Sequence, residues 1–192
     1  RKHPRYLYVI DQSYADYTLA TMLDPKEMTD VFNLMLVHSL SLKYCIPGLR
    51  LGYIVASPII IGRLKQIRQP WTINALAIEA GKYLIENNVQ MIPDLKAYLT
   101  EAQRLRQNLC AIEGLKVMKT DTNFMLVSID KGTSVELKRW LIDNYGILIR
   151  DAANIRGLDD NYFRVTAQTP EEDDQLIEAL KEYVTHLTEV SD

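Results

Sequence analysis

The chain has 192 residues, of which 47% are hydrophobic and 24% are charged, and its formal net charge is −3. These values are typical of a globular protein with one ordinary domain or two small ones, and the acidic balance argues against a general nucleic-acid binder. No apolar run approaches the roughly 20 residues that span a bilayer, and three scattered histidines without a CxxC pair argue against a zinc site. Two cysteines and no signal-like start predict a cytoplasmic protein.

The first third of the chain reads as strands. The run YLYVI, residues 6–10, ends at Asp11 and the polar sequence QSYADYT, as short apolar strands of parallel α/β sheets do. Because the chain enters this buried-strand pattern almost at once, we expect a central strand of a larger fold whose N-terminal portion is missing. Similar runs predict strands at residues 31–39 and 50–57.

Helices dominate the middle of the chain, and strands alternate with helices in the last third. The apolar spacing predicts helices at residues 58–69 (stopped by Pro70), 74–88 (with Asn74 as N-cap), 95–112, 134–146 (ending at Gly146) and 169–184. Strands are predicted at residues 123–129, 147–150 and 161–167. At the start of the last helix, Thr169 and Glu172 have the spacing of a capping box. The break at residues 91–94 predicts a boundary between two domains, residues 1–93 and 94–192.

Several polar residues follow or occupy the predicted strands. They are Asp11 and Tyr14 in DQSY, Ser39, Ser41, Lys43 and Arg50 in SLSLK…GLR, and Arg150 and Arg164 in ILIRD and YFRV. Taken singly, each has an ordinary explanation as a turn former, a solvated loop charge or an edge-strand charge. Their occurrence together is what indicates a site.

Five segments carry a resemblance to a known family. VIDQSY, SLSLKYCIPGLRLGY, RQPWTINALA, TNFMLV and ILIRDAANIRGLDDNYFRV run in one order over nearly the whole chain. Together they resemble the second half of the fold-type I pyridoxal 5'-phosphate (PLP) enzymes, the aspartate aminotransferase superfamily. IPGLRLGY and QPWTINALA are most similar to its L-threonine O-3-phosphate decarboxylase branch, a relative of histidinol-phosphate aminotransferase. The resemblance implies an α/β fold, with part of the large PLP-binding domain in residues 1–93 and a small α+β C-terminal domain in residues 94–192.

The resemblance also implies which residues bind pyridoxal 5'-phosphate. Asp11 would keep the ring nitrogen protonated, because a nearby carboxylate favours the charged form, and Tyr14 would hydrogen-bond the phenolic oxygen. The cofactor phosphate would be held by Ser39 and Arg50, with Ser41 assisting.

The implied substrate is a small phosphorylated amino acid. Arg164 resembles the arginine that binds the substrate α-carboxylate, Arg150 is a candidate for the substrate phosphate or carboxylate, and Asn154 is a further candidate. The implied reaction is decarboxylation of L-threonine O-3-phosphate to 1-amino-2-propanol O-phosphate in cobalamin biosynthesis, and an aminotransferase of the histidinol-phosphate type is the alternative. A homodimer is implied, without nucleic-acid, membrane or metal partners.

One position departs from the family pattern in a way that matters for catalysis. The Schiff-base lysine of the superfamily lies eight residues before the phosphate-binding arginine, and counting back from Arg50 gives Leu42, with Lys43 beside it. Leucine has no amine, so it cannot form the Schiff base. Three explanations remain open: a modified lysine written with the wrong letter, an inactive variant that makes the chain a non-catalytic fragment or pseudoenzyme, or Lys43 acting after a local backbone adjustment. Two further departures are the missing N-terminal cofactor residues and Gln168, where some relatives have a basic residue.

Overall fold

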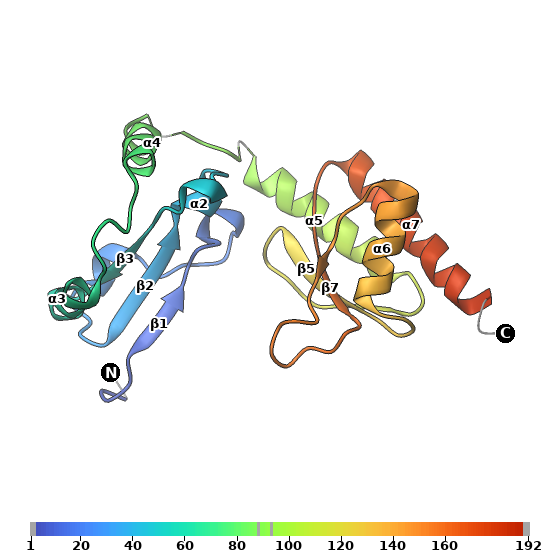
Figure 1. The fold of residues 1–192 in the computed structure, drawn as a ribbon, viewed down its shortest axis with the longest axis horizontal. Helices are drawn as coiled ribbons and strands as arrows, with labels where there is room; N and C mark the ends of the chain where they lie inside the picture. Colours follow the sequence, from blue (N-terminus) through green and yellow to red (C-terminus); the bar gives the residue numbers. More distant parts are fainter. Residues whose placement is uncertain (1–2, 88, 93, 190–192) are drawn as a thin grey trace. The chain divides into compact units, whose positions relative to one another are not determined.

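The structure, a computed structural model, describes residues 3–87, 89–92 and 94–189. The chain divides into two compact units, Arg1–Pro93 and Asp94–Asp192, called unit 1 and unit 2 below (Figure 1). Each unit contains its own β-sheet together with helices. The fold therefore belongs to the mixed α/β class that the sequence predicted.

Unit 1 is built on a three-stranded sheet in the order β1-β2-β3. Strand β2 (Leu34–Ser39) is central, with β1 (Tyr8–Asp11) parallel to it on one side and β3 (Gly52–Ala56) antiparallel on the other. The helical elements are η1 (Ala15–Tyr17), α1 (Pro25–Met28), α2 (Leu40–Lys43), η2 (Pro47–Leu49), α3 (Pro58–Ile67) and α4 (Ala75–Glu86). Since β1 and β2 are parallel, their carboxyl ends meet at one edge of the sheet.

The first strand was predicted to be a central strand of a larger fold, and this stays a prediction because the structure describes only the sheet formed by this chain. Strand β1 lies at the edge of the sheet, and Tyr8, Val9 and Ile10 are 40%, 54% and 37% exposed. By contrast, Leu36 of the central strand β2 is fully buried. An apolar run predicts a strand but not its neighbours, because its side chains are buried only where another layer packs on them.

The other predicted elements of unit 1 are confirmed with shorter bounds. Helix α3 ends at Ile67, before Pro70. Helix α4 begins after Asn74, whose side chain accepts a hydrogen bond from the Ala77 N–H (2.8 Å), as expected of an N-cap. The predicted end of this helix at Asn88 lies outside the described residues.

Unit 2 combines a four-stranded antiparallel sheet with three helices around one core. The strands are β4 (Leu115–Val117), β5 (Phe124–Ile129), β6 (Arg150–Asp151) and β7 (Tyr162–Thr166), in the order β4-β5-β7-β6. The helices are α5 (Leu95–Cys110), α6 (Ser134–Tyr145) and α7 (Pro170–Glu189) (Figure 1). Fully buried side chains come from all three helices and from the two central strands: Leu105, Leu109, Val127, Leu137, Leu141, Phe163 and Leu180.

The helix ends of unit 2 follow the local sequence. The Thr169 N–H and hydroxyl donate to Glu172, and the Glu172 N–H donates back to Thr169, which confirms the predicted capping box. Gly146 ends α6 with a φ of 66°, a left-handed conformation that favours glycine.

The predicted strand at residues 147–150 is largely wrong. Strand β6 begins only at Arg150, because the Ile147 N–H instead donates to the Leu141 carbonyl and closes the end of α6. Strand β4 was not predicted, since three residues give too short a pattern.

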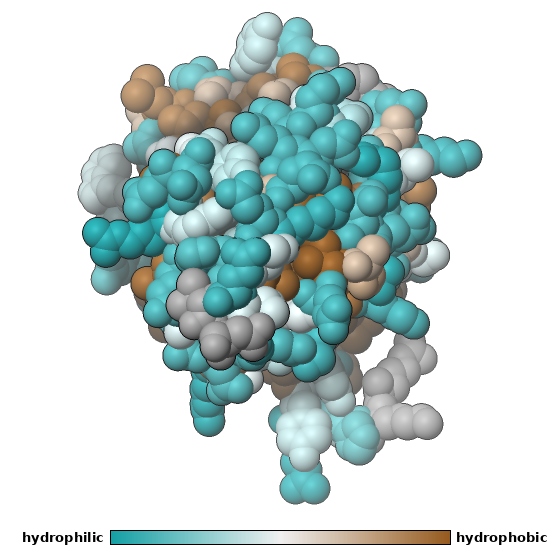
Figure 2. Space-filling view, turned by 90° about the vertical axis from the view of Figure 1, so that its right-hand side faces the viewer, coloured by the Kyte–Doolittle hydropathy of each residue, from teal (hydrophilic) through white to brown (hydrophobic). Residues whose placement is uncertain are grey.

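The surface is mainly hydrophilic on the face seen in Figure 2, with smaller hydrophobic areas. Within residues 3–87, 89–92 and 94–189, no helix combines the length and apolar composition needed to cross a membrane. The same residues contain no group of three or more His, Cys, Asp or Glu side chains arranged to hold a metal ion.

Candidate functional site

The edge of the unit 1 sheet where β1 and β2 end carries the first group of candidate residues. Asp11 is the last residue of β1, and Ser39 is the last residue of the parallel strand β2. The Asp11 carboxylate accepts a hydrogen bond from the Ser13 N–H (2.9 Å). Hydrogen bonds from the side chain and backbone of Ser13 lower the pKa of Asp11, with a smaller contribution from His38. Asp11 is therefore an ionised carboxylate at the strand end, suited to a protonated heterocyclic nitrogen.

Tyr14 lies just beyond Asp11, immediately before the short helix η1. It is partly buried, and its ring lies 5.8 Å from that of Tyr17 in an edge-to-face arrangement. The Tyr17 hydroxyl in turn donates to the Leu42 carbonyl (3.0 Å). Through these contacts the DQSY segment packs against helix α2, so the DQSY and SLSLK motifs lie next to each other.

Helix α2 begins at Ser39, which acts as its N-cap. The Ser39 Oγ accepts from the Leu42 N–H (3.1 Å), so its hydroxyl proton can still be donated to an anion. The Ser41 hydroxyl has a different role. It is buried, accepts from the Leu51 N–H (2.9 Å) and donates to the Leu51 carbonyl (3.1 Å). Because its one hydroxyl proton is donated to Leu51, Ser41 cannot also donate to a phosphate, and its role is structural.

Leu42 and Lys43 are the two positions considered for the Schiff-base residue. Leu42 is partly buried on α2. The Lys43 Nζ lies 3.2 Å from Asp16 Oδ1. Partial burial opposes protonation of Lys43, but the hydrogen bond and charge of Asp16 outweigh it and raise the lysine pKa. An amine must be neutral to act as a nucleophile, so this ion pair disfavours a covalent role for Lys43.

Arg50 follows the short helix η2 in an uncommon backbone conformation. Its φ is 55°, in the left-handed region where non-glycine residues are rare. The side chain is exposed, and its Nη1 donates to the Pro47 carbonyl (3.0 Å). This contact uses one of the several N–H donors of the guanidinium, so Arg50 retains donors for an anion.

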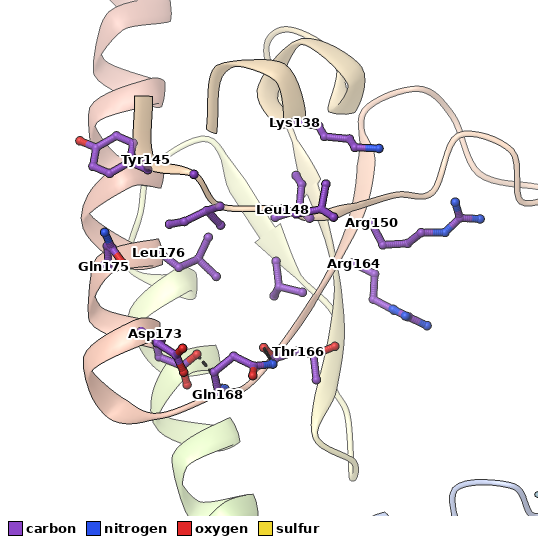
Figure 3. Close-up of a pocket in the computed structure, with 15 residues that line it drawn as sticks. Lys138, Tyr145, Leu148, Arg150, Arg164, Thr166, Gln168, Asp173, Gln175 and Leu176 are labelled. Atoms are coloured by element: carbon purple, nitrogen blue, oxygen red, sulfur yellow. Dashed lines mark hydrogen bonds between the residues drawn. The ribbon is translucent and has the colours of Figure 1, made fainter. Parts of the chain in front are cut away.

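Unit 2 brings the other two candidate arginines together. Arg150 of β6 is paired with Arg164 of β7 in the antiparallel register, so both side chains leave the same face of the sheet. Figure 3 shows them extending side by side. The Arg150 Nη2 donates to Asn154 Oδ1 (3.0 Å), which makes Asn154 a neighbour that holds Arg150. The Arg164 guanidinium lies over the Phe124 ring (5.1 Å), and its buried Nε has no hydrogen-bond partner within the described part of the chain.

These arginines line a cavity of about 630 Å³ in unit 2. Lys138, Thr166 and Gln168 also line it (Figure 3). Two like charges directly across a strand pair repel each other, and an anion between them removes that repulsion. The geometry is thus that of a site for one or two carboxylate or phosphate groups.

The sequence did not reveal several residues that shape these sites. Ser13 hydrogen-bonds Asp11, Asp16 pairs with Lys43, and Tyr17 contacts Leu42. All three lie in the QSYADYT segment that follows β1, whose polar composition was the available signal. Lys138 could not be found, because only the tertiary fold brings α6 to this cavity.

The fold, with an acidic strand end in unit 1 and an arginine pair in unit 2, is that of the PLP-dependent, aminotransferase-like proteins. The chain belongs to the family "Aminotransferase class I and II", whose family model matches residues 1–180.

The chain is similar to several named members of this family. The chain is 30% identical over 178 residues to the threonine-phosphate decarboxylase of Salmonella typhimurium, covering 92% of this chain and 48% of that protein. It is 31% identical over 177 residues to histidinol-phosphate aminotransferase 1 of Carboxydothermus hydrogenoformans, covering 92% and 48%. Among solved structures, L-threonine-O-3-phosphate decarboxylase from Porphyromonas gingivalis matches with a TM-score of 0.91 and 37% identity, over 96% of this chain and 57% of that one. The chain thus spans about half the length of these relatives.

The cofactor of this family is pyridoxal 5'-phosphate, and the residues present fit it in all but one respect. Asp11, Ser39 and Arg50 have the carboxylate, the free hydroxyl proton and the guanidinium donors that would suit the ring nitrogen and phosphate. The exception is the covalent anchor, since Leu42 has no amine and Lys43 is paired with Asp16.

Proposed function

We propose that this chain is part of a PLP-dependent enzyme that decarboxylates L-threonine O-3-phosphate to 1-amino-2-propanol O-phosphate, a step of cobalamin biosynthesis. The observation that carries the proposal is the pairing of Arg150 with Arg164 across β6 and β7. Threonine phosphate has two anionic groups, a carboxylate and a phosphate, which two adjacent guanidiniums can bind. Relatives named for this reaction are among those most similar to the chain.

The residues of unit 1 would hold the cofactor. Asp11 keeps a proton on the ring nitrogen, Tyr14 donates to the phenolic oxygen, and Ser39 and Arg50 bind the phosphate. The bound ring supplies a sink for the electron pair released at the substrate Cα. On this proposal, unit 1 is part of the large PLP-binding domain of the complete protein.

The residues of unit 2, the proposed small C-terminal domain, would orient the substrate. Arg164 binds the α-carboxylate, while Arg150, held by Asn154, binds the second anionic group. The direction in which the carboxylate is held selects the bond that breaks: decarboxylation requires the Cα–carboxylate bond to be aligned, and transamination requires the Cα–H bond. An aminotransferase of the histidinol-phosphate type is the alternative within the same family.

A second candidate, a non-catalytic member of the family, is favoured by Leu42. It retains the cofactor-type and anion-type residues but has no amine at the position of the family lysine. A homodimer in the cytoplasm remains a prediction for the complete protein, and light scattering of the purified protein tests the oligomeric part.

The identity of residue 42 provides the test. The complete protein that contains this chain and its Leu42→Lys variant are incubated with pyridoxal 5'-phosphate, reduced with borohydride and digested, and the mass of the peptide containing Ser41 to Tyr44 is measured by mass spectrometry. We expect the cofactor mass and CO2 release from L-threonine O-3-phosphate only in the variant, because leucine has no amine to form the covalent anchor. Lys43→Met is the matched control and should change neither result.

The outcomes separate the candidates. Dependence of product formation on 2-oxoglutarate in the Leu42→Lys variant would replace the decarboxylase with an aminotransferase. Cofactor labelling without turnover of either kind would favour the non-catalytic member. A natural cofactor mass at position 42 of the wild-type chain would show that the residue there is a modified lysine.

A further inference from the structure

The start of α7 carries an acidic run, Glu171 to Asp174, in which one carboxyl group is unlike the others. Asp173 is only 1% exposed, whereas its acidic neighbours are exposed. Its Oδ1 accepts from the Gln168 N–H (3.1 Å), but its buried Oδ2 has no hydrogen-bond donor within the described residues. A buried carboxylate with an unsatisfied oxygen is costly, so Asp173 requires a compensating proton or partner.

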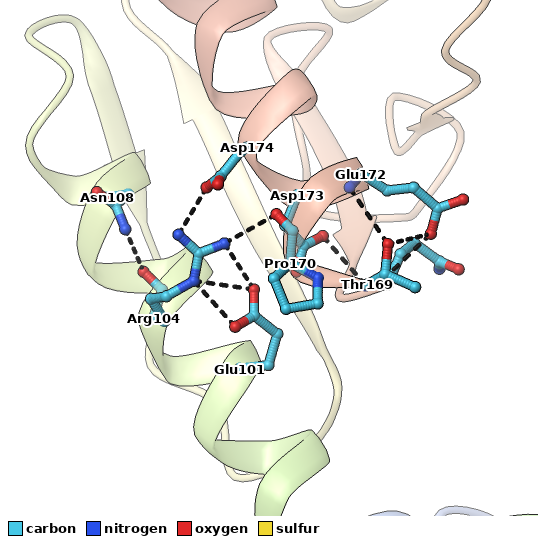
Figure 4. A network of polar contacts seen from close by, with 9 residues as sticks. Glu101, Arg104, Asn108, Thr169, Pro170, Glu172, Asp173 and Asp174 are labelled. Atoms are coloured by element: carbon cyan, nitrogen blue, oxygen red, sulfur yellow. Dashed lines mark hydrogen bonds and ion pairs between the residues drawn. The ribbon is translucent and has the colours of Figure 1, made fainter.

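The group that faces Asp173 is a second carboxyl group, Glu101 of α5. Arg104 donates to both Glu101 oxygens (2.8 and 2.9 Å), to Asp174 (2.6 Å) and to the Pro170 carbonyl (3.1 Å) (Figure 4). Arg104 thus holds the Glu101 carboxylate against the start of α7, where Asp173 lies, and a side-chain hydrogen bond with Glu101 is among the causes that raise the pKa of Asp173. Two carboxyl oxygens can form a hydrogen bond only when one of them carries a proton.

The surroundings decide which carboxyl group holds that proton. The hydrogen bonds from Arg104 lower the pKa of Glu101 and keep it ionised. Burial and the neighbouring Glu101 carboxylate raise the pKa of Asp173 to about 7, although the Gln168 N–H opposes this rise. The proton therefore lies on Asp173 and is lost close to neutral pH.

This carboxyl pair is connected to the arginine cavity. Asp173 and Gln168 line the same cavity as Arg150 and Arg164 (Figure 3). Gln168 also follows Ala167, the first residue after β7, whose N–H donates to the Asn123 carbonyl and whose carbonyl accepts from the Tyr98 hydroxyl. A change in the protonation of Asp173 therefore alters the charge of the cavity wall directly. It also acts through the hydrogen bond to Gln168, in the segment that follows β7.

We infer that Asp173 and Glu101 share a single proton, and that loss of this proton weakens anion binding at Arg150 and Arg164. The inference rests on the proposed function only in taking the cavity as an anion site. With the proton in place, Asp173 adds no negative charge opposite the arginines. Without it, a carboxylate lines the cavity, and repulsion from Glu101 strains the α5–α7 contact.

The other charged or titratable groups of the surrounding elements do not duplicate this role. They are Arg104 on α5, Lys138 and Tyr145 on α6, Arg150 on β6, Arg164 on β7, and Glu172 and Asp174 on α7. Glu172 is exposed and occupied by the Thr169 capping box, and Asp174 is paired with Arg104. Asp173 is the buried carboxyl group of this set.

Sulfate binding to the full chain tests the inference without cofactor or substrate. Sulfate keeps the same charge between about pH 5.5 and about pH 8.5, so any pH dependence of its affinity belongs to the protein. Titrations are followed by NMR at the Arg164 Nε–H signal. For the wild type we expect the affinity to fall roughly fivefold to tenfold across this range, with a midpoint near pH 7. Asp173→Asn, neutral and of the same shape, should bind sulfate with no such fall.

Two further variants make the result specific. Glu178→Gln removes an exposed carboxylate from the same helix, where it pairs with Lys181, and should follow the wild-type profile. Glu101→Gln removes the facing charge, so the fall should move to lower pH, which keeps the inference testable if Asp173→Asn does not fold. The infrared band of a protonated carboxyl group should persist in the wild type up to about pH 7 and be absent from Asp173→Asn.

Three results would overturn the inference: no sulfate binding at any pH, a wild-type affinity independent of pH, or the same fall in Asp173→Asn as in the wild type. A different result would contradict the proposed function without contradicting this inference. If the Leu42→Lys variant releases no CO2 but sulfate binding follows the expected profile, the anion site and its proton stand while the decarboxylase does not.

Discussion

The two units differ in how completely they bury their apolar side chains. In unit 2, three helices and the sheet enclose one core, in which residues such as Leu137 and Phe163 are fully buried. In unit 1, Val9 of β1, Ile54 of β3 and Leu76 of α4 are 54%, 41% and 76% exposed. Because burial of apolar surface is the main source of folding free energy, unit 2 is expected to be the more stable unit. The predicted cofactor residues thus lie in the less well covered unit.

The largest effect is expected from a core substitution in unit 2. Phe163→Ala should lower the free energy of unfolding by about 3 to 5 kcal/mol, because it leaves a cavity among fully buried side chains. The matched change in unit 1, Val9→Ala at an exposed edge strand, should change it by less than about 0.5 kcal/mol. Urea denaturation followed by Trp140 fluorescence, in a Trp71→Phe background, measures the unit 2 transition.

Hydrogen exchange checks the same comparison in the wild-type chain. Amides of β5 and β7 should exchange more slowly than those of β1 and β3. Equal protection of the two sheets, or equal losses for Phe163→Ala and Val9→Ala, would contradict the difference between the units.

The next largest effect is on how the free energy of unfolding depends on pH, which should have opposite signs for Asp173 in unit 2 and Asp11 in unit 1. In unit 2, the folded-state pKa of Asp173 is raised to about 7 from 3.8, so its contribution to stability is present at low pH and is lost as the pH rises from about 4 to about 7. The change should be on the order of 3 kcal/mol and disappear in Asp173→Asn. In unit 1, the pKa of Asp11 is lowered, so its smaller contribution is present above the ordinary aspartate pKa and is lost on acidification.

Denaturation curves at several pH values, for the wild type, Asp173→Asn and Asp11→Asn, separate the two contributions. The prediction for unit 2 is wrong if stability rises between about pH 4 and about pH 7 in the wild type relative to Asp173→Asn.

The smallest effect concerns helix caps, which should be similar in the two units. Thr133 caps α6 in a capping box with Glu136, and Asn74 caps α4 through the Ala77 N–H. Thr133→Ala and Asn74→Ala should each cost about 1 kcal/mol. Hydrogen exchange should locate the loss in α6 and α4 respectively. If Asn74→Ala affected unit 2 amides equally, the units would not unfold independently.

The features that depend on neighbouring residues could be predicted from the sequence. The capping box at Thr169, the glycine end of α6 and the N-cap at Asn74 each depend on a few adjacent positions, and the structure contains all three. What covers β1 could not be predicted, because an apolar run does not specify its neighbours.

In the candidate sites too, contacts between residues distant in the sequence could not be predicted. The sequence indicated Arg150 and Arg164 separately, but their position across from each other depends on the register of β6 and β7. It gave no indication of the Asp173–Glu101 pair, because the two residues are joined only by the packing of α5 against α7. The use of Ser41 by the Leu51 backbone likewise required the path of the chain after η2.

The backbone of Arg50 has a consequence for how this sequence changes over generations. A left-handed conformation disfavours a residue with a side chain by on the order of 1 kcal/mol, whereas glycine adopts it without strain. Glycine or asparagine at position 50 would relieve this strain, so we expect arginine to be kept there only where its guanidinium is needed. Comparing position 50 between variants that carry leucine at position 42 and variants that carry lysine there would reveal whether losing the amine also relaxed selection for the phosphate ligand.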